Sequence, residues 1–289
     1  MKKIFLKIYK FFFFTSLFGS FFITQSALAF IPIINEPSKQ ELESTSIQIR
    51  RTAIQLIQFG QNTEAIKLLE LAIKLNPQDK DLWINLAEAQ VRLNREYEAL
   101  SSLNKAIKLK PKEARVYFRK ASIYMELNNP KKAKIFIMNG LSIDNNNEKG
   151  YFQLGNAEIM LNNYKLALLA FKKSSKINSK FWQAINNEGL VLYELNNPKK
   201  AISKFKSALE ISNNAEPMLA LAVLLYSSEN NNNESLKLAK KALESNPKYV
   251  SKEYQEKQLW GKKLQKSAQL LFKSKEMKKV VKEAKEKSQ

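Results

Sequence analysis

The stretch ELNNPKKA occurs twice in the chain, at residues 126–133 and at residues 194–201. The two copies lie 68 residues apart, which is two steps of 34 residues. An alanine follows the same step of 34 and recurs at Ala65, Ala99, Ala133, Ala167 and Ala201. A fixed period of this length predicts stacked copies of one supersecondary unit.

The period divides the middle of the chain into six consecutive units. They are residues 46–79, 80–113, 114–147, 148–181, 182–215 and 216–249. The fifteenth residue of each unit is Gly60, Asn94, Asn128, Asn162, Asn196 and Asn230. Because Gly and Asn tolerate the left-handed backbone that ends a helix, each unit should contain a helix, a tight stop and a second helix.

Small and large apolar side chains occupy fixed positions within the units. The eighth position is Ala53, Ala87, Ala121, Gly155, Gly189 and Val223, and a large apolar residue follows four after the repeated alanine at Leu69, Leu103, Ile137, Phe171 and Phe205. Small side chains let two helices approach closely, and the spacing is typical of a buried helical stripe. We therefore expect Ala133 and Ala201 to be packed between helices.

Together these positions resemble the tetratricopeptide repeat family. Its aromatic at position four is matched by Trp83, Tyr117 and Tyr151, and its tyrosine at position eleven by Tyr124 and Tyr226. The first and last units depart from the pattern, with Ile49 in place of the aromatic and Ser235 with Ala239 in place of the usual Ala and aromatic pair. The resemblance implies an all-α superhelical solenoid of about six helix-turn-helix repeats, in which terminal units are commonly atypical.

The composition limits the kinds of catalytic and metal-binding site that the chain can form. The chain of 289 residues contains no Cys and no His, so thiolate and imidazole nucleophiles and the usual zinc, copper and haem ligands are excluded. Its seven glycines form no phosphate-binding loop. We expect a protein that is not an enzyme, has no cofactor and takes no small-molecule substrate; chemistry by dispersed Asp and Glu residues is the alternative.

The N-terminal 29 residues read as a secretory signal peptide. A basic segment precedes an apolar run over residues 11–23, and small residues follow at Ala27 and Ala29. The apolar run is shorter than the ~20 residues that a membrane span needs, so we expect cleavage after Ala29 and repeats that lie outside the cytoplasm. An uncleaved N-terminal anchor is the alternative.

Two segments flank the repeats. In residues 30–45, Ser38 and Glu41 make a capping box, so the first helix should begin before residue 46. Residues 250–272 have apolar side chains at mostly helical intervals, and we expect one helix that caps the open end of the solenoid. Residues 273–289 are rich in Lys and Glu, and we expect a frayed helix or a tail there.

A short run in the capping segment, Gln258-Leu259-Trp260-Gly261, is similar to the ends of exported tetratricopeptide-repeat proteins of cyanobacteria and plastids. The resemblance implies a periplasmic or thylakoid-lumen location and makes photosystem assembly a candidate process. The fold alone does not decide between such tasks.

The formal net charge is +21, and residues 248–289 hold thirteen lysines against five glutamates. A basic balance attracts nucleic acid, anionic lipid or acidic protein, and export makes nucleic acid the least suitable partner. We expect protein or peptide partners, some of them acidic, no nucleic acid, and peripheral contact with an anionic membrane through the basic C-terminal helix. Lysines that only solvate the outer faces of the helices are the alternative.

The first helix of each unit should line the concave side of the solenoid, where a ligand would lie. Aromatic, Met and Asn side chains suited to a peptide segment fall there, at Phe118, Phe152, Asn156, Met160, Asn187 and Tyr193.

A second group of predicted site residues resembles the family's clamp for a C-terminal carboxylate: Arg50, Asn85, Arg115 and Arg119. Ile54 stands where that clamp has Asn. We expect the three arginines to converge and to bind an acidic or C-terminal segment; a merely basic wall is the alternative.

These patterns predict a scaffold that binds protein segments and serves as an adaptor or assembly factor for a membrane or envelope complex. The alternative is a permanent structural subunit of a secretion, pilus or cell-wall machine.

Overall fold

The computed structural model describes residues 36–228 and 232–288 of the chain, and every regular element in these ranges is a helix. The chain contains one compact unit of residues 40–289, to which all the helices below belong apart from the first residue of α2. The predicted signal peptide of residues 1–29 and the predicted stop at Asn230 lie outside the described residues. The expected all-α fold is confirmed.

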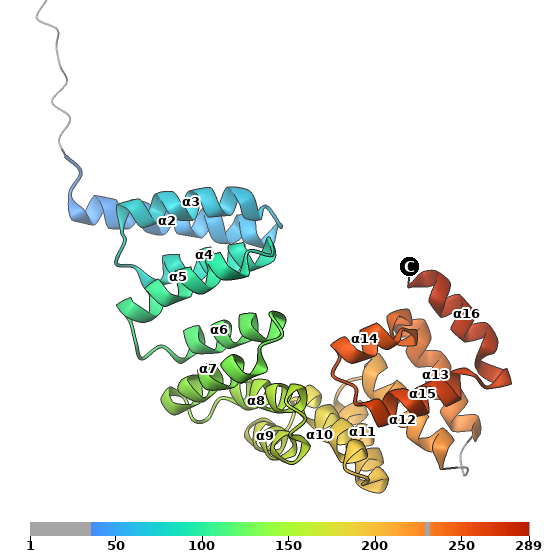
Figure 1. Cartoon of the computed structure of the whole chain (residues 1–289). Coiled ribbons are helices and arrows are strands. Elements are labelled where there is room, and N and C mark those ends of the chain that lie inside the picture. Colours follow the sequence, from blue (N-terminus) through green and yellow to red (C-terminus); the bar gives the residue numbers. More distant parts are fainter. Residues whose placement is uncertain (1–35, 229–231, 289) are drawn as a thin grey trace, which may run out of the picture. The chain divides into compact units, whose positions relative to one another are not determined.

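Twelve of the helices follow one another as six pairs (Figure 1). The pairs are α2 (Lys39–Gln58) with α3 (Asn62–Leu75), α4 (Lys80–Arg92) with α5 (Glu96–Leu109), α6 (Ala114–Glu126) with α7 (Pro130–Ile143), α8 (Glu148–Met160) with α9 (Tyr164–Ile177), α10 (Trp182–Glu194) with α11 (Pro198–Ile211), and α12 (Ala215–Ser227) with α13 (Asn232–Ser245). As the capping box predicts, α2 begins before residue 46. Each pair also packs on the next, which makes the stack a solenoid.

The stops inside the pairs have the predicted backbone. Asn94, Asn128, Asn162 and Asn196 have φ angles of 55°, 52°, 60° and 63°, and Gly60 has a φ angle of 78°. This left-handed conformation ends the first helix of each pair and turns the chain into the second.

The helices of a pair touch through a small residue and a large one. Ala133 and Ala201 are fully buried, as predicted. A Cβ atom added to Gly189 would lie only 2.6 Å from the ring of Phe205, and one added to Gly155 would collide with Phe171. The two phenylalanines therefore fill the space that Ala and Leu share in the first two pairs, where Ala53 and Ala87 stand in place of glycine.

The C-terminal segment differs from the expectation. It contains η1 (Pro247–Val250), α14 (Lys252–Lys257), α15 (Lys262–Phe272), η2 (Lys275–Met277) and α16 (Lys278–Lys287), so residues 250–272 are not one helix. The break lies at Leu259, whose φ angle of 61° no helix can contain. Of the frayed helix or tail predicted for residues 273–289, the structure has a helix, α16, but one that is packed rather than loose, because the side chains of Met277 and Ala284 are buried.

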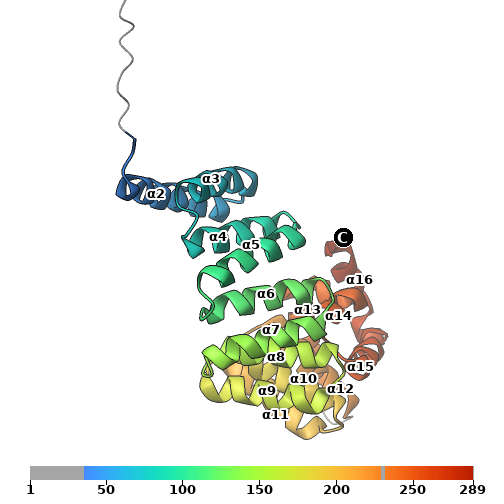
Figure 2. The ribbon, with the colours of Figure 1, turned by 60° about the vertical axis from the view of Figure 1, so that its left-hand side comes forward.

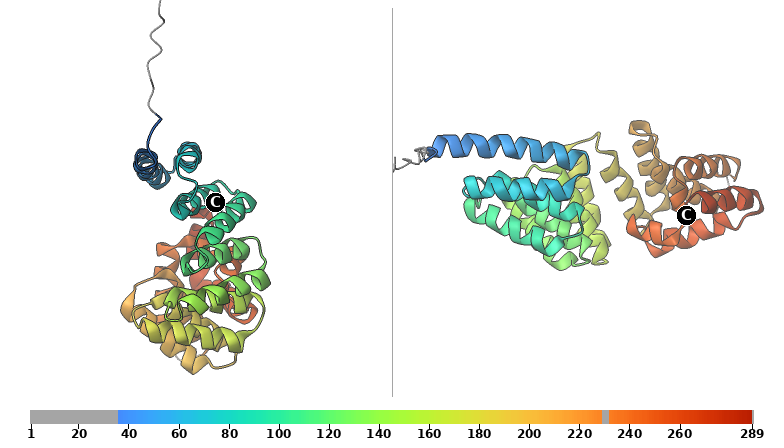
Figure 3. Two further views of the ribbon diagram at one scale, coloured as in Figure 1. Left: turned by 90° about the vertical axis from the view of Figure 1, so that its left-hand side faces the viewer. Right: turned by 90° about the horizontal axis from the view of Figure 1, so that it is seen from above.

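The position of these helices corrects the predicted cap. α16 packs against α13 and η1 at the end of the stack, whereas α15 packs against α12 and α10, the first helices of the last two pairs. The C-terminal helices gather with α12 and α13 in the views of Figures 2 and 3. Among the described residues, no helix is long and apolar enough to span a membrane.

Candidate functional site

Three adjoining pockets follow the first helices of successive pairs. The Glu88 pocket, of about 220 Å³, lies between α4 and α6, and the Phe152 pocket, of about 460 Å³, lies between α6 and α8. The Glu216 pocket, of about 420 Å³, lies among α8, α10, the start of α12 and α14. Ser122 and Glu126 line both of the first two pockets, and Phe152 and Asn156 line both of the last two, so the three form one continuous groove.

Apolar side chains form much of the Phe152 pocket. Met125 reaches it from α6, Phe152 from α8 and Phe181 from the loop before α10. The rings of Phe152 and Phe181 pack with their centroids 5.1 Å apart, and Phe152 also contacts Phe171 at 5.7 Å, which fixes its orientation. The pocket therefore has firm aromatic walls and a flexible Met, and it suits an apolar side chain.

Carboxamide groups line the groove beside this pocket. Asn186 donates to Asn187 Oδ1 at 3.2 Å, and Asn187 donates to Asn156 Oδ1 at 3.1 Å. These bonds use the acceptor of Asn156, and no partner of its Nδ2 group is found among the described residues. Gln153 has the opposite arrangement: its Nε2 donates to Ser122 Oγ at 2.7 Å, while its buried Oε1 accepts no hydrogen bond from residues 36–228 or 232–288. The groove thus offers one donor and one acceptor from the same face of α8.

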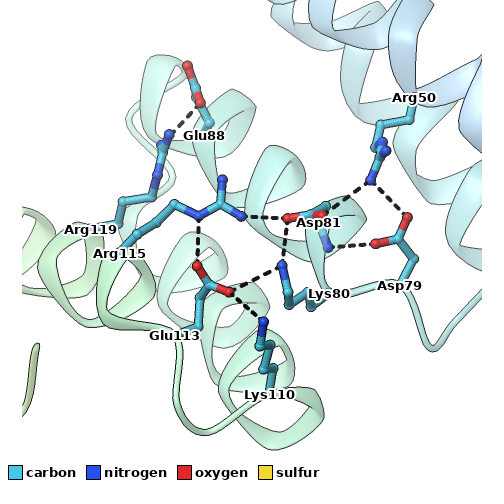
Figure 4. Close-up of polar contacts among 9 residues, drawn as sticks. All are labelled: Arg50, Asp79, Lys80, Asp81, Glu88, Lys110, Glu113, Arg115 and Arg119. Atoms are coloured by element: carbon cyan, nitrogen blue, oxygen red, sulfur yellow. Dashed lines mark hydrogen bonds and ion pairs between the residues drawn. The ribbon is translucent and has the colours of Figure 1, made fainter. Parts of the chain in front are cut away.

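The predicted arginines are already paired (Figure 4), and Arg119 lines the Glu88 pocket. Arg50 contacts Asp79 at 2.9 Å and Asp81 at 3.6 Å. Arg115 contacts Asp81 at 2.6 Å. Arg50 and Arg115 therefore converge on one carboxylate, but it belongs to α4 of the same chain.

The same pairing extends to the neighbouring charges in Figure 4. Arg119 contacts Glu88 at 3.0 Å, and Lys80 contacts both Asp81 and Glu113. Burial opposes the ionised form of Asp81, but the hydrogen bonds and charges of Lys80 and Arg115 outweigh it and lower the pKa of Asp81. An acidic segment would therefore compete with these carboxylates for the arginines.

The other predicted residues are half-buried, turned away from the groove, or covered by another part of the chain. Asn85 and Met160 are half-buried on α4 and α8. Phe118 is turned away from the groove, since its ring packs on the backbone of Gly140 and Gly150 between α7 and α8. The covered position is Tyr193.

Tyr193 is covered by the chain itself. Its side chain is buried, its hydroxyl lies 2.8 Å from Ser267 Oγ of α15, and Lys263 Nζ lies 4.4 Å from its ring centroid. The expectation that Tyr193 and Phe118 contact a ligand directly is therefore not supported by their surroundings. The reason is tertiary: α15 covers Tyr193, and the Phe118 ring fills the space beside Gly140 and Gly150, which have no side chains.

Several groove residues were not among the predicted ones. Ser122, Glu126 and Gln153 fall on repeat positions that face the groove, so the period could have found them. Glu216, Tyr249 and Tyr254 join the groove only because the C-terminal segment folds back, and no local pattern marks them. No group of His, Cys, Asp or Glu that could hold a metal ion is found in the described ranges.

Comparison with known proteins agrees with this geometry. Two family models, both described as tetratricopeptide repeat, match residues 56–100 and 114–147. No curated protein sequence matches the chain.

Solved structures share the fold at low sequence identity. PilF of Pseudomonas aeruginosa has a TM-score of 0.64 at 18% identity and covers 76% of this chain and 98% of its own. PilW, a type IV pilus biogenesis factor, has a TM-score of 0.62 at 18% identity, with coverages of 74% and 98%. YrrB, which is described as having an unusual peptide-binding site, has a TM-score of 0.50 at 24% identity, with coverages of 62% and 92%.

The repeat period, the left-handed stops, the paired helices and the two family matches agree with one another. Residues 56–100 and 114–147 are tetratricopeptide repeats, and the other helix pairs share their period and fold.

Proposed function

We propose that the protein is a non-enzymatic scaffold whose groove, from the Glu88 pocket to the Glu216 pocket, binds an extended segment of another protein. The observation that carries this proposal is the Phe152 pocket, together with two groups beside it whose hydrogen-bonding capacity is not used within the described residues: Gln153 Oε1 and Asn156 Nδ2. A pocket of aromatic and Met side chains holds an apolar anchor residue, while polar groups beside it fix the orientation of the ligand.

The amide groups suit the backbone of such a segment. A peptide unit offers one N–H donor and one C=O acceptor, and the groove presents the Oε1 acceptor of Gln153 and the Nδ2 donor of Asn156 three residues apart on α8. Hydrogen bonds to the backbone would bind many sequences, and the apolar pocket would then select among them.

We propose further that the protein is exported and serves as an adaptor or assembly factor for a membrane or envelope complex. This rests on the basic segment, apolar run and small residues that end at Ala29, and on the likeness of residues 258–261 to exported proteins of cyanobacteria and plastids. The same likeness makes the periplasm or the thylakoid lumen the proposed compartment and photosystem assembly a candidate process.

Two finer features of the partner are also proposals. A partner with an acidic segment would compete with Asp81 and Glu88 for the arginines. An anionic membrane would contact the exposed lysines of α16, such as Lys279 and Lys282, whose side chains are 89% and 80% exposed.

The test is capture of partners from the membranes of the native host by residues 30–289, with cross-linking to map the bound segment. We expect one or a few membrane-associated proteins whose cross-links fall on α6, α8 and the loop before α10. Phe152→Ala and Asn156→Ala should each weaken capture, whereas Leu169→Ala, at an exposed position of α9, should not. Cross-links confined to the outer helices, or capture that ignores both groove variants, would contradict the proposal.

A permanent structural subunit of a pilus, secretion or cell-wall machine is the second candidate. The fold similarity to PilF and PilW favours the pilus among these. A complex of fixed stoichiometry that survives purification would support this role, and transient association with newly made membrane proteins would support the assembly factor.

A further inference from the structure

Three glutamate side chains are buried within the described parts of the chain, and their surroundings differ. Glu158 forms an ion pair with Lys134 at 2.7 Å, and Glu188 forms one with Lys204 at 2.8 Å. Glu216 has no cationic partner among the described residues; its Oε1 accepts only a hydrogen bond from Trp260 Nε1 at 3.0 Å. A buried carboxylate is costly unless a cation or several donors compensate it.

The other side of Glu216 faces a pocket with an unusual lining. Aromatic residues and carboxamides surround it: Phe152, Trp182, Tyr249 and Tyr254, with Asn156, Gln183, Asn187, Asn214, Asn246 and Gln258. The rings of Tyr249 and Tyr254 meet edge to face at 4.9 Å, and Tyr249 also packs on Trp260 at 5.8 Å. These contacts hold Tyr249 and Trp260 in place around the carboxyl group.

The charges around the pocket leave Glu216 without compensation. Lys257 from α14 is the one cationic residue of the lining, and it is exposed and makes no ion pair with Glu216. Burial, together with the charge of Glu216, raises the pKa of the Tyr249 hydroxyl, so that group is neutral. The helices α8 and α10 contribute only neutral side chains to the lining.

We propose that the Glu216 pocket binds the cationic side chain, Lys or Arg, of the segment that lies in the groove. The carboxylate supplies the counter-charge, and the aromatic rings attract a cation through their faces. The inference rests on the proposed function, because it names a residue that the bound segment carries, one pocket beyond its apolar anchor. It places a basic residue at this end of the ligand, whereas the sequence suggested an acidic residue near the arginines, at the other end of the groove.

The protonation of Glu216 fits this role. Burial raises the pKa of Glu216 to about 7, and the hydrogen bond from Trp260 only partly opposes that change. A cation that enters the pocket stabilises the ionised form, so its binding releases a proton near neutral pH.

The test uses two small probes on the full chain, so it does not depend on finding the partner. Nα-acetyl-lysine N-methylamide carries the cation, and Nα-acetyl-norleucine N-methylamide has a similar length and no charge. NMR titration follows the indole N–H signals of Trp182 and Trp260. We expect the lysine probe to bind about tenfold more tightly than the norleucine probe at pH 8.

Variants separate the pocket from other causes. Glu216→Gln keeps an acceptor for Trp260 and should abolish the preference for lysine, while Glu244→Gln, at an exposed position of α13, should keep it. Circular dichroism melts establish that both variants fold. Equal binding of the two probes, or a preference that survives Glu216→Gln, would overturn the proposal. A preference that emerges only in Lys257→Ala would overturn it too, because the chain's own lysine would then be the occupant.

The outcomes also separate this inference from the proposed function. A segment that cross-links to α6 and α8 while neither probe discriminates would leave the groove function standing and remove the cation site. A lysine preference without any captured segment would leave the cation site standing and remove the scaffold role.

Discussion

The groove is open along α4, α6 and α8 and, beyond the Glu216 pocket, filled along α10 and α12, although both stretches are built from the same repeat. In α8, Phe152, Gln153 and Asn156 remain partly exposed, whereas residues 215–225 of α12 are all buried. The difference comes from α15, which places Leu264, Ala268 and Leu271 against α12 and α10 with no exposed surface. A face that would bind a partner's helix has become part of the protein's own core.

The contacts of α15 show how the filled stretch is held. The Glu194 carboxylate, at the end of α10, accepts hydrogen bonds from the backbone N–H groups of Lys263 at 3.3 Å and Leu264 at 3.0 Å. These donors lie in the first turn of α15 and have no partner within that helix, so Glu194 caps α15 from another part of the chain. Gly261 allows this approach, because a Cβ atom there would collide with Glu194.

The largest expected effect tests whether the C-terminal segment that begins after residue 246 is an integral part of the core. Trp260→Ala removes a buried indole between α12 and η1, and it should lower the free energy of unfolding by about 3–5 kcal/mol. Chemical denaturation followed by far-ultraviolet circular dichroism measures the loss. Leu270→Ala, at an exposed position on α15, is the matched control and should change little. If Trp260→Ala melts like the control, the filled stretch is only loosely attached and the contrast between the two regions disappears.

Glu216 lies where the two regions meet, and its ionisation gives the second-largest expected change in the free energy of unfolding. The pKa of Glu216 is raised from 4.5 to about 7, so the folded chain holds this proton more tightly than the unfolded chain. Stability from Glu216 is therefore greatest at low pH and is lost as pH rises from 4.5 through 7. The loss amounts to about 3 kcal/mol.

The measurement is the difference between wild type and Glu216→Gln in free energy of unfolding at pH 5 and pH 8. The variant should gain stability relative to wild type as pH rises, because it never ionises. Tyr249, Tyr254 and Lys257 line the same pocket, but none carries a carboxyl group that would titrate in this window. Glu244→Gln, an exposed site on α13, is the control. A difference that is flat from pH 5 to pH 8 would show that Glu216 is better solvated than the pocket implies.

The third effect tests packing that both regions share. Gly189→Ala places a methyl group against the Phe205 ring and should cost about 1–2 kcal/mol, after the better helix propensity of Ala is included. Phe205→Leu in the same chain should recover much of that loss, because the pair then matches Ala87 and Leu103 of the second repeat.

Gly155→Ala makes the same change in the open stretch, against Phe171. We expect a smaller cost there, because α10 is held between α11 and α15 while α8 has a free groove side. Thermal melts of Gly189→Ala, Phe205→Leu, Gly155→Ala and the double mutant measure these costs. Additive effects of Gly189→Ala and Phe205→Leu would mean that the two residues do not share one space.

The repeat architecture could be predicted because its signals are local. The stops depend on Asn and Gly at one position, and the helix pairs depend on small and large residues whose spacing is visible in the chain. The course of the C-terminal segment could not be predicted, because an apolar stripe such as Leu264 and Leu271 does not reveal which apolar face it covers. The left-handed Leu259 gave no local sign either, since the residues that usually adopt this backbone are Gly and Asn.

The candidate site was predicted in part for the same reason. Phe152, Asn156 and Asn187 line the groove as their repeat positions indicate. Arg119 lines the groove as predicted, but the carboxylate partners of the arginines come from neighbouring helices, and a single helix pattern does not show them. Asp81 reaches Arg115 only because consecutive repeats stack.

The smallest expected effect concerns Arg115 and Arg119, and it tests which end of the open groove binds the ligand. Arg115 and Arg119 have side chains that are 50% and 43% exposed, so their ion pairs with Asp81 and Glu88 should each contribute about 0–1 kcal/mol to stability. If the ligand lies mainly in the Phe152 and Glu216 pockets, a double variant with Arg115→Ala and Arg119→Ala should bind the captured segment within about twofold of wild type, whereas Phe152→Ala should weaken binding at least tenfold. Calorimetry with the mapped segment at two salt concentrations compares them. A large loss in the arginine variant that shrinks in high salt would show instead that the arginines bind the segment through their charge.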